Sequence, residues 1–114
     1  MIPLTHVDRK SYHSLLNDGK QDLGKLQDRY GAGFAFRLQG ILCAMTVRQA
    51  ARDSHQEGFY VDSAQALYDI VMRYDYGSIF EDNGLDAYKP SKPLLDAMLY
   101  SMCQAEMDDY REAS

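Results

Sequence analysis

Apolar residues recur at helical spacing through the middle of the sequence. Between Gln21 and Gln56 most of them fall three or four positions apart, at Leu23, Leu26, Tyr30, Phe34, Leu38, Ile41, Leu42 and Met45. From residue 34 to residue 51 apolar side chains occur on every side of the helix axis, which predicts a buried helix at the centre of the domain or at the seam of a dimer. Gly31 and Gly33 interrupt the pattern, so we expect a break or kink near Tyr30–Gly33.

Shorter helices are predicted on both sides of this segment. The first opens at Thr5, where Thr-His-Val-Asp forms a loose capping box, and ends near Gly19, which suits the left-handed position after a helix. A second capping box, Asp62–Gln65, opens a helix that Tyr76–Gly77 closes, and Ser78–Glu81 favours one short helical turn.

The last predicted helix is long and runs from about residue 92 to residue 111. Its predicted buried stripe consists of Leu95, Met98, Leu99, Met102, Cys103 and Tyr110. Ser91 is its expected N-cap, and Pro93 falls in the first turn, where its missing donor is harmless. Asp108 and Asp109 lie at the unfavourable negative end of this helix, which hints at a use outside the helix. The sequence therefore predicts an all-α fold over residues 1–114: a single-domain bundle of about four to five helices, with the helix around 34–51 at its centre.

Size and composition favour one soluble globular domain. The chain has 114 residues, of which 46% are hydrophobic and 25% are charged. No apolar run approaches the roughly 20 residues that a membrane span needs, and the first residues lack the pattern of a signal peptide. Cys43 and Cys103 are too few for a disulfide scaffold or a zinc site, so we expect a cytoplasmic protein that contacts no membrane.

Charge is distributed unevenly between the two halves of the chain. Residues 1–57 hold eight Lys/Arg and six Asp/Glu, whereas residues 58–114 hold four Lys/Arg and eleven Asp/Glu, within a net charge of -5. An acidic half of this kind repels a phosphate backbone, so direct nucleic-acid binding is not expected. Two interpretations stay open: the acidic half binds a protein with a basic surface, or its charge serves solubility alone.

The segment from residue 74 to residue 88 is the predicted partner-binding surface, because it alternates aromatic and carboxylate side chains. Tyrosine gives a large contact area with a polar tip, and carboxylates suit a partner rich in Lys and Arg. The alternative is that its aromatic residues close one end of the bundle. The predicted partner-binding residues are Tyr74, Asp75, Tyr76, Phe80, Glu81, Asp82, Asp86 and Tyr88.

One pair of residues suggests an enzyme. Arg48 and His55 are separated by six residues, and this spacing resembles the R-x4-6-H motif of the HEPN ribonucleases, a superfamily of small helical bundles that dimerise. The resemblance, which covers eight residues, implies that the histidine handles protons and the arginine steadies the phosphate charge. The structural alternative is a helix end where Arg52 and His55 favour the negative end of the helix dipole.

Other motifs that carry chemistry are missing from the sequence. It contains no phosphate-binding glycine loop and no G-x-S-x-G, H-E-x-x-H or C-x-x-C motif. His6 and His13 share a predicted helix face but lack further metal ligands there. We therefore expect no metal and no cofactor.

Three function classes follow from these patterns. The first is a small acidic interaction module that binds a basic protein surface; we expect it to be regulatory and to form a homodimer. Its most specific form is an inhibitor that occupies a nucleic-acid-binding site. The second is a HEPN-like ribonuclease that uses Arg48 and His55. The third is a small helical subunit of a larger complex.

Overall fold

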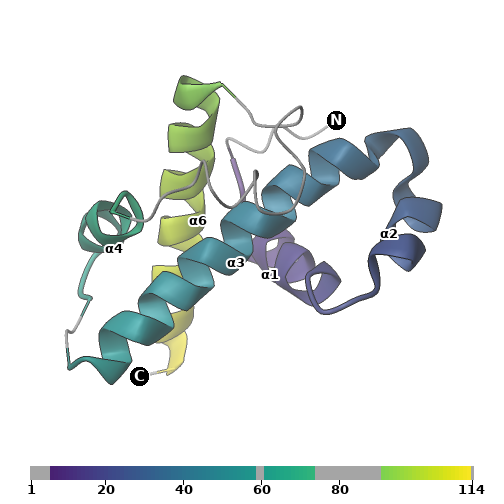
Figure 1. Cartoon of the computed structure of the whole chain (residues 1–114). Coiled ribbons are helices and arrows are strands. Elements are labelled where there is room, and N and C mark those ends of the chain that lie inside the picture. The colour runs from purple at the N-terminus through teal and green to yellow at the C-terminus, as the bar shows by residue number, and fades with distance from the viewer. Residues whose placement is uncertain (1–5, 59–60, 74–90, 114) are drawn as a thin grey trace.

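A long helix, α3 (Phe34–Gln56), runs through the middle of the molecule and contacts α1, α2, α4 and α6. Figure 1 shows this helix crossing α6, with α4 and α1 on either side of the crossing and α2 at the far end. The computed structural model describes residues 6–58, 61–73 and 91–113. Within these ranges the chain is all-α and has no strand, as the sequence predicts.

The other helices are shorter, apart from the last one. Each of them packs against α3, and α6 also contacts α1 and α4, so α3 and α6 form the crossed centre of the bundle. Their bounds are α1 (Arg9–Asp18), α2 (Leu23–Tyr30), the 3₁₀ helix η1 (Gly31–Gly33), α4 (Ala64–Val71) and α6 (Lys92–Ala113).

Two helices begin later than the sequence predicts. In α1 the N-cap is Asp8, whose carboxylate accepts a 2.7 Å hydrogen bond from the Ser11 backbone, whereas Thr5 was expected in this role. In α4 the hydroxyl of Ser63, rather than the carboxylate of Asp62, accepts from the backbone of Ala66 at 3.1 Å. Both caps satisfy a backbone N–H that the first turn leaves without a partner inside the helix.

Helix ends also differ in part from the prediction. Helix α4 already ends at Val71, well before the expected stop at Tyr76–Gly77. Helix α6 begins at Lys92, directly after Ser91, as predicted. The expected turn at Ser78–Glu81 lies outside the described residues.

The glycines of the α1–α3 connection serve different purposes. Gly31 has φ +55° and starts η1, so the chain breaks between α2 and α3 where the sequence predicts. Gly19 was expected in the left-handed region but has φ −62°. Its small size matters instead, because a Cβ at Gly19 would lie 2.7 Å from Sδ of Met45 on α3. Glycine therefore lets the end of α1 approach α3 closely.

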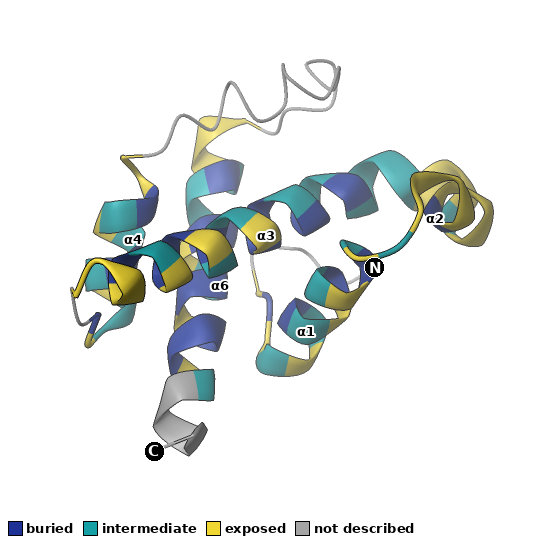
Figure 2. Ribbon diagram, turned by 60° about the horizontal axis from the view of Figure 1, so that its bottom comes forward, coloured by how far each residue is buried: buried dark blue, intermediate teal, exposed yellow. Residues whose placement is uncertain are grey.

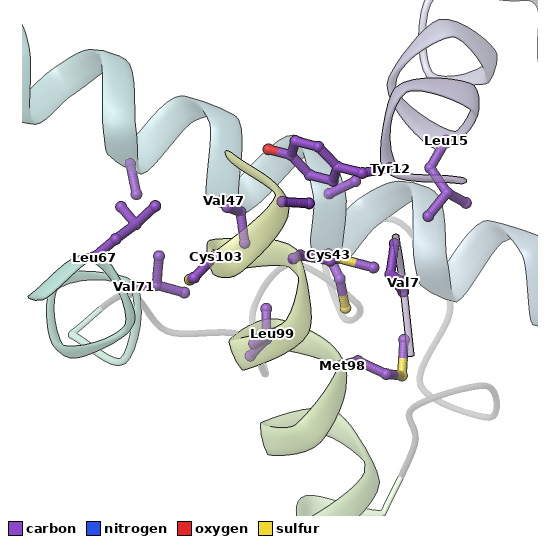
Figure 3. Close-up of a cluster of buried hydrophobic side chains, with 14 of the residues drawn as sticks. Val7, Tyr12, Leu15, Cys43, Val47, Leu67, Val71, Met98, Leu99 and Cys103 are labelled. Atoms are coloured by element: carbon purple, nitrogen blue, oxygen red, sulfur yellow. The ribbon is translucent and has the colours of Figure 1, made fainter. Parts of the chain in front are cut away.

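The hydrophobic core lies where α1, α3, α4 and α6 meet. Figure 2 shows the buried residues on the facing sides of these helices, and Figure 3 shows Val47, Leu67, Val71, Leu99 and Cys103 converging between α3, α4 and α6. The predicted apolar stripe of the last helix is buried here. Its buried members are Leu95, Met98, Leu99, Met102 and Cys103.

Helix α3 is central and largely buried, but it retains one exposed edge. Met45 is 43% exposed, and Gln49 and Arg52, one and two turns further on, are exposed as well. Leu42, which the pattern places among the apolar residues of this helix, is only partly buried. The edge faces neither α4 nor α6, and it adjoins the end of α1.

Both cysteines are buried in this core as free thiols. Burial penalises the thiolate and raises the pKa of Cys43 to about 12, and that of Cys103 to about 12 as well, where the charge of Glu106 adds to the effect. Both sulfurs therefore remain protonated at neutral pH and act as small apolar groups rather than nucleophiles.

Two leucines provide a matched test of this core. Leu99 is fully buried and Leu23 is 59% exposed. We expect Leu99→Ala to lower the free energy of unfolding by about 2–5 kcal/mol, and Leu23→Ala to lower it by less than about 0.5 kcal/mol. Urea denaturation followed by circular dichroism measures both. Equal losses for the two variants would contradict the described core.

Candidate functional site

The segment predicted to bind a partner lies outside the described residues. All eight of its named residues fall within residues 74–90, so their role stays a prediction. These residues are Tyr74, Asp75, Tyr76, Phe80, Glu81, Asp82, Asp86 and Tyr88. The described ranges nevertheless contain two groups of ionisable residues and one acidic surface that bear on function.

The first group surrounds a buried carboxylate on α6. Glu106 is 1% exposed, and its Oε1 accepts hydrogen bonds from the hydroxyl of Tyr12 at 2.6 Å and from Nε of Arg48 at 2.5 Å. The guanidinium of Arg48 also lies 5.6 Å from the centre of the Tyr12 ring. One carboxylate therefore joins α1, α3 and α6 in the interior of the bundle.

Asp109, one turn further along α6, extends this group toward the surface. Its carboxylate accepts from Nε of Arg9 at 2.6 Å and from Nη2 of Arg48 at 3.1 Å, and it lies 2.9 Å from Nε2 of His13. We call Arg9, Tyr12, His13, Arg48, Glu106 and Asp109 the Glu106 network.

Burial and neighbouring charges shift the pKa values of three members of the network. Burial and the adjacent charge of Glu106 raise the pKa of Tyr12, so its hydroxyl remains a donor. Burial disfavours the charged form of Arg48, but its contacts with Tyr12 and Glu106 outweigh this effect and raise the pKa of Arg48. Partial burial would raise the pKa of Asp109, yet hydrogen bonds from His13 and Arg9 lower it. The network is thus a set of matched donors and acceptors.

Asp109, one of the acidic residues at the unfavourable end of α6, is matched inside the molecule. Its carboxylate is bound by three basic residues of the N-terminal half of the chain. Part of the charge difference between the two halves is therefore neutralised inside the molecule.

A second buried carboxylate joins the end of α1 to α2 and α3. Asp18, at the end of α1, is 3% exposed and accepts from the hydroxyl of Tyr30 at 2.6 Å and from Nε of Arg37 at 2.9 Å. Arg29 lies 3.4 Å away, and Arg37 also donates to the hydroxyl of Ser14 at 2.7 Å. In α2 only Leu26 is buried, so the polar contacts of Asp18 also hold this helix in place.

Arg48 and His55 both lie on α3, but in different environments. The Arg48 guanidinium is occupied by two carboxylates of α6, while His55 is exposed in the last turn of the helix. The ribonuclease interpretation stays a prediction. His55→Ala is its cleaner test, since a change at Arg48 also breaks the Glu106 network.

An acidic and aromatic stripe follows the outer side of α6. Asp96, Tyr100, Gln104 and Asp108 succeed one another at four-residue spacing, and Tyr100 packs edge-on against Tyr68 of α4 with ring centres 5.5 Å apart. Between this stripe and the start of α4 lies a groove of about 450 Å³, which Tyr100, Gln104 and Asp108 help to line. We call Tyr68, Asp96, Tyr100, Gln104 and Asp108 the α4–α6 surface.

Other candidate chemistry finds no support among the described residues. In these ranges no three His, Cys, Asp or Glu side chains are placed to hold a metal ion. None of the described helices combines the length and apolar character that a membrane span requires.

Comparisons with known proteins give no family. No protein-family model matches the chain, and neither curated proteins nor solved structures provide a match. We therefore infer function from the residues and their geometry alone.

Sequence reasoning missed the Glu106 network, although a signal was present. Glu106 falls three and four residues after Cys103 and Met102, which places it on the predicted buried stripe of the last helix. Arg48 likewise falls on the buried side of α3, between Ala44 and Ala51. A buried carboxylate and a partly buried arginine on facing stripes each require a partner. The pattern could have indicated that they pair.

The Glu106–Arg48 contact can be tested by a double-mutant cycle. Glu106→Leu leaves Arg48 and the Tyr12 hydroxyl without their acceptor, so we expect it to cost about 3–5 kcal/mol of unfolding free energy. Glu106→Leu combined with Arg48→Met is expected to cost less than the sum of the single changes, by about 0.5–3 kcal/mol. The control Asp96→Ala removes an exposed pair with Lys92 and is expected to cost under about 1 kcal/mol. Additive losses in urea denaturation would contradict the coupling.

Asp109 makes stability depend on acid pH. Because its pKa is lower in the folded state, its contribution is fully present above the unfolded value of about 3.9 and is lost as pH falls toward the folded value. We expect Asp109→Asn to unfold at lower urea concentration at neutral pH, and to lose less stability than the original chain between about pH 5 and pH 3. Urea titrations across this range measure the difference; parallel curves for the two proteins would refute it.

Proposed function

We propose that the chain is a non-enzymatic interaction module that binds a basic protein surface. The observation that carries this proposal is the α4–α6 surface, where tyrosines and carboxylates lie together on two packed helices. Tyr100 is 37% exposed, and Gln104 and Asp108 beside it are exposed. Tyrosine is enriched at protein interfaces, and carboxylates around it attract and orient a partner rich in Lys and Arg.

The charge balance around this surface supports the same partner chemistry. Residues 61–73 and 91–109 carry Asp62, Asp69, Asp96 and Asp108 in addition to the two carboxylates of the Glu106 network, against the two bases Arg73 and Lys92. The predicted partner-binding segment, which contributes Asp75, Glu81, Asp82 and Asp86, connects α4 to α6 along the chain.

The most specific form of the proposal is an inhibitor that presents carboxylates where a nucleic-acid backbone would lie on its partner. Such a partner has a basic site of its own, and this chain and a nucleic acid would compete for that site.

Self-association stays a separate prediction. The large exposed apolar residues of the described chain each belong to a different stretch: Leu23, Met45, Met72 and Tyr100.

Charge reversal with a matched control tests the proposal. Asp96→Lys with Asp108→Lys changes the α4–α6 surface, while Asp28→Lys with Glu57→Lys makes the same change in net charge at exposed positions of α2 and the end of α3. We expect the first pair to abolish capture of the physiological partner from a lysate of the source cells, and the second pair to retain it. Quantitative mass spectrometry of the captured proteins measures the result.

Further outcomes define the partner's chemistry. Reversal of Asp75, Glu81, Asp82 and Asp86 to lysine is expected to remove the same captured protein, and added salt is expected to weaken its binding, since exposed charge pairs are screened. Displacement of the chain by RNA or DNA would support the inhibitor form. A partner that binds all variants equally at every salt concentration would contradict the proposal.

A further inference from the structure

A pocket of about 190 Å³ lies between the end of α1 and the exposed edge of α3. None of its lining residues belongs to the α4–α6 surface. Its lining comes from one face of each helix and from the turn after α1. The lining residues are His13, Leu16, Asn17, Gly19, Lys20, Met45, Arg48, Gln49 and Arg52.

Basic side chains dominate the ionisable groups of this α1–α3 pocket. His13, Lys20, Arg48 and Arg52 line it, and no carboxylate does. Across the described part of the chain, neither Lys20 nor Arg52 has a carboxylate within ion-pair distance. These two cations concentrate positive potential in a concave site, which attracts an anion.

The remaining bases of the pocket are held in place. Asp109 contacts both Nη2 of Arg48 and Nε2 of His13, so these side chains form an ordered wall. The backbone carbonyls of Leu15 and Asn17 at the end of α1 accept from Gly19 and Lys20. Carbonyl oxygens at the end of a helix repel an anion. Here two of them already accept hydrogen bonds from the turn after α1, which reduces this repulsion in part.

The pocket also has an apolar part. Leu16 of α1 and the exposed Met45 of α3 line it beside the bases, and Met45 contacts the end of α1 because residue 19 is glycine. If the charged group of a ligand lies between Lys20 and Arg52, the rest of the ligand contacts this apolar wall. The volume is below the roughly 300–1,000 Å³ of sites for drug-sized ligands, so the ligand must be small.

We propose that the α1–α3 pocket binds a small phosphomonoester, with the phosphate between Lys20 and Arg52 and the organic group against Leu16 and Met45. Arginine presents a planar fork that matches phosphate oxygens, and lysine adds a compact point charge. Asn17 also lines the pocket, and its side-chain amide is of a type that can donate to a phosphate oxygen.

Binding of phenyl phosphate, inorganic phosphate and benzoate at constant ionic strength tests this proposal. We expect saturable binding of phenyl phosphate in calorimetry, at least threefold tighter than inorganic phosphate and at least tenfold tighter than benzoate. In NMR spectra the largest shifts are expected at the backbone amides of Lys20 and Arg52 and their neighbours. Equal binding of benzoate would refute phosphate recognition, and equal binding of inorganic phosphate would refute the role of the apolar wall.

Variants with a matched control complete the test. Lys20→Ala with Arg52→Ala is expected to weaken phenyl phosphate binding at least tenfold, whereas Lys25→Ala with Arg73→Ala removes the same charges at exposed positions outside the pocket and is expected to leave binding unchanged. Circular dichroism confirms that both double variants retain the fold. Equal weakening by both pairs would show general charge attraction and overturn the site.

Discussion

The arrangement of the bundle depends on a carboxylate that is buried where three helices meet. Glu106 has almost no contact with solvent, so an unpaired charge there would cost several kcal/mol. Tyr12 on α1 and Arg48 on α3 satisfy it, and both donors must lie within hydrogen-bond distance of one oxygen. Apolar contacts between helices tolerate small shifts, whereas this contact does not. It therefore sets how α1 and α3 pack against α6.

The same contact pairs charges from the basic and the acidic half of the sequence. Arg9 and Arg48 belong to the basic half of the chain, and Glu106 and Asp109 belong to the acidic half. Their ion pairs join the two halves, and Asp18 joins the end of α1 to α2 and α3 in a comparable way. Charge that is matched inside the fold is not available to a partner. The α4–α6 surface carries the carboxylates of Asp96 and Asp108, whereas the α1–α3 pocket is lined by bases.

The two surfaces define two different kinds of recognition. The α4–α6 surface is open and combines tyrosine with carboxylate, which suits a protein with a basic face. The α1–α3 pocket is small and concave and holds Lys20 and Arg52, which pair with no carboxylate of the described residues, beside an apolar wall; this suits a small anion.

The sequence by itself determined the fold class, the central helix, the break at Gly31 and the buried stripe of α6, because each depends on spacing or backbone chemistry within a short segment. It placed the cap of α1 three residues early and the cap of α4 one residue early, because Thr5 and Asp8, like Asp62 and Ser63, can each accept a hydrogen bond at a helix start. Only the tertiary structure decided that Glu106 pairs with Arg48, that Asp109 faces inward and that Gly19 admits Met45. These contacts join residues up to a hundred positions apart, and their distances follow from how whole helices pack rather than from any local pattern.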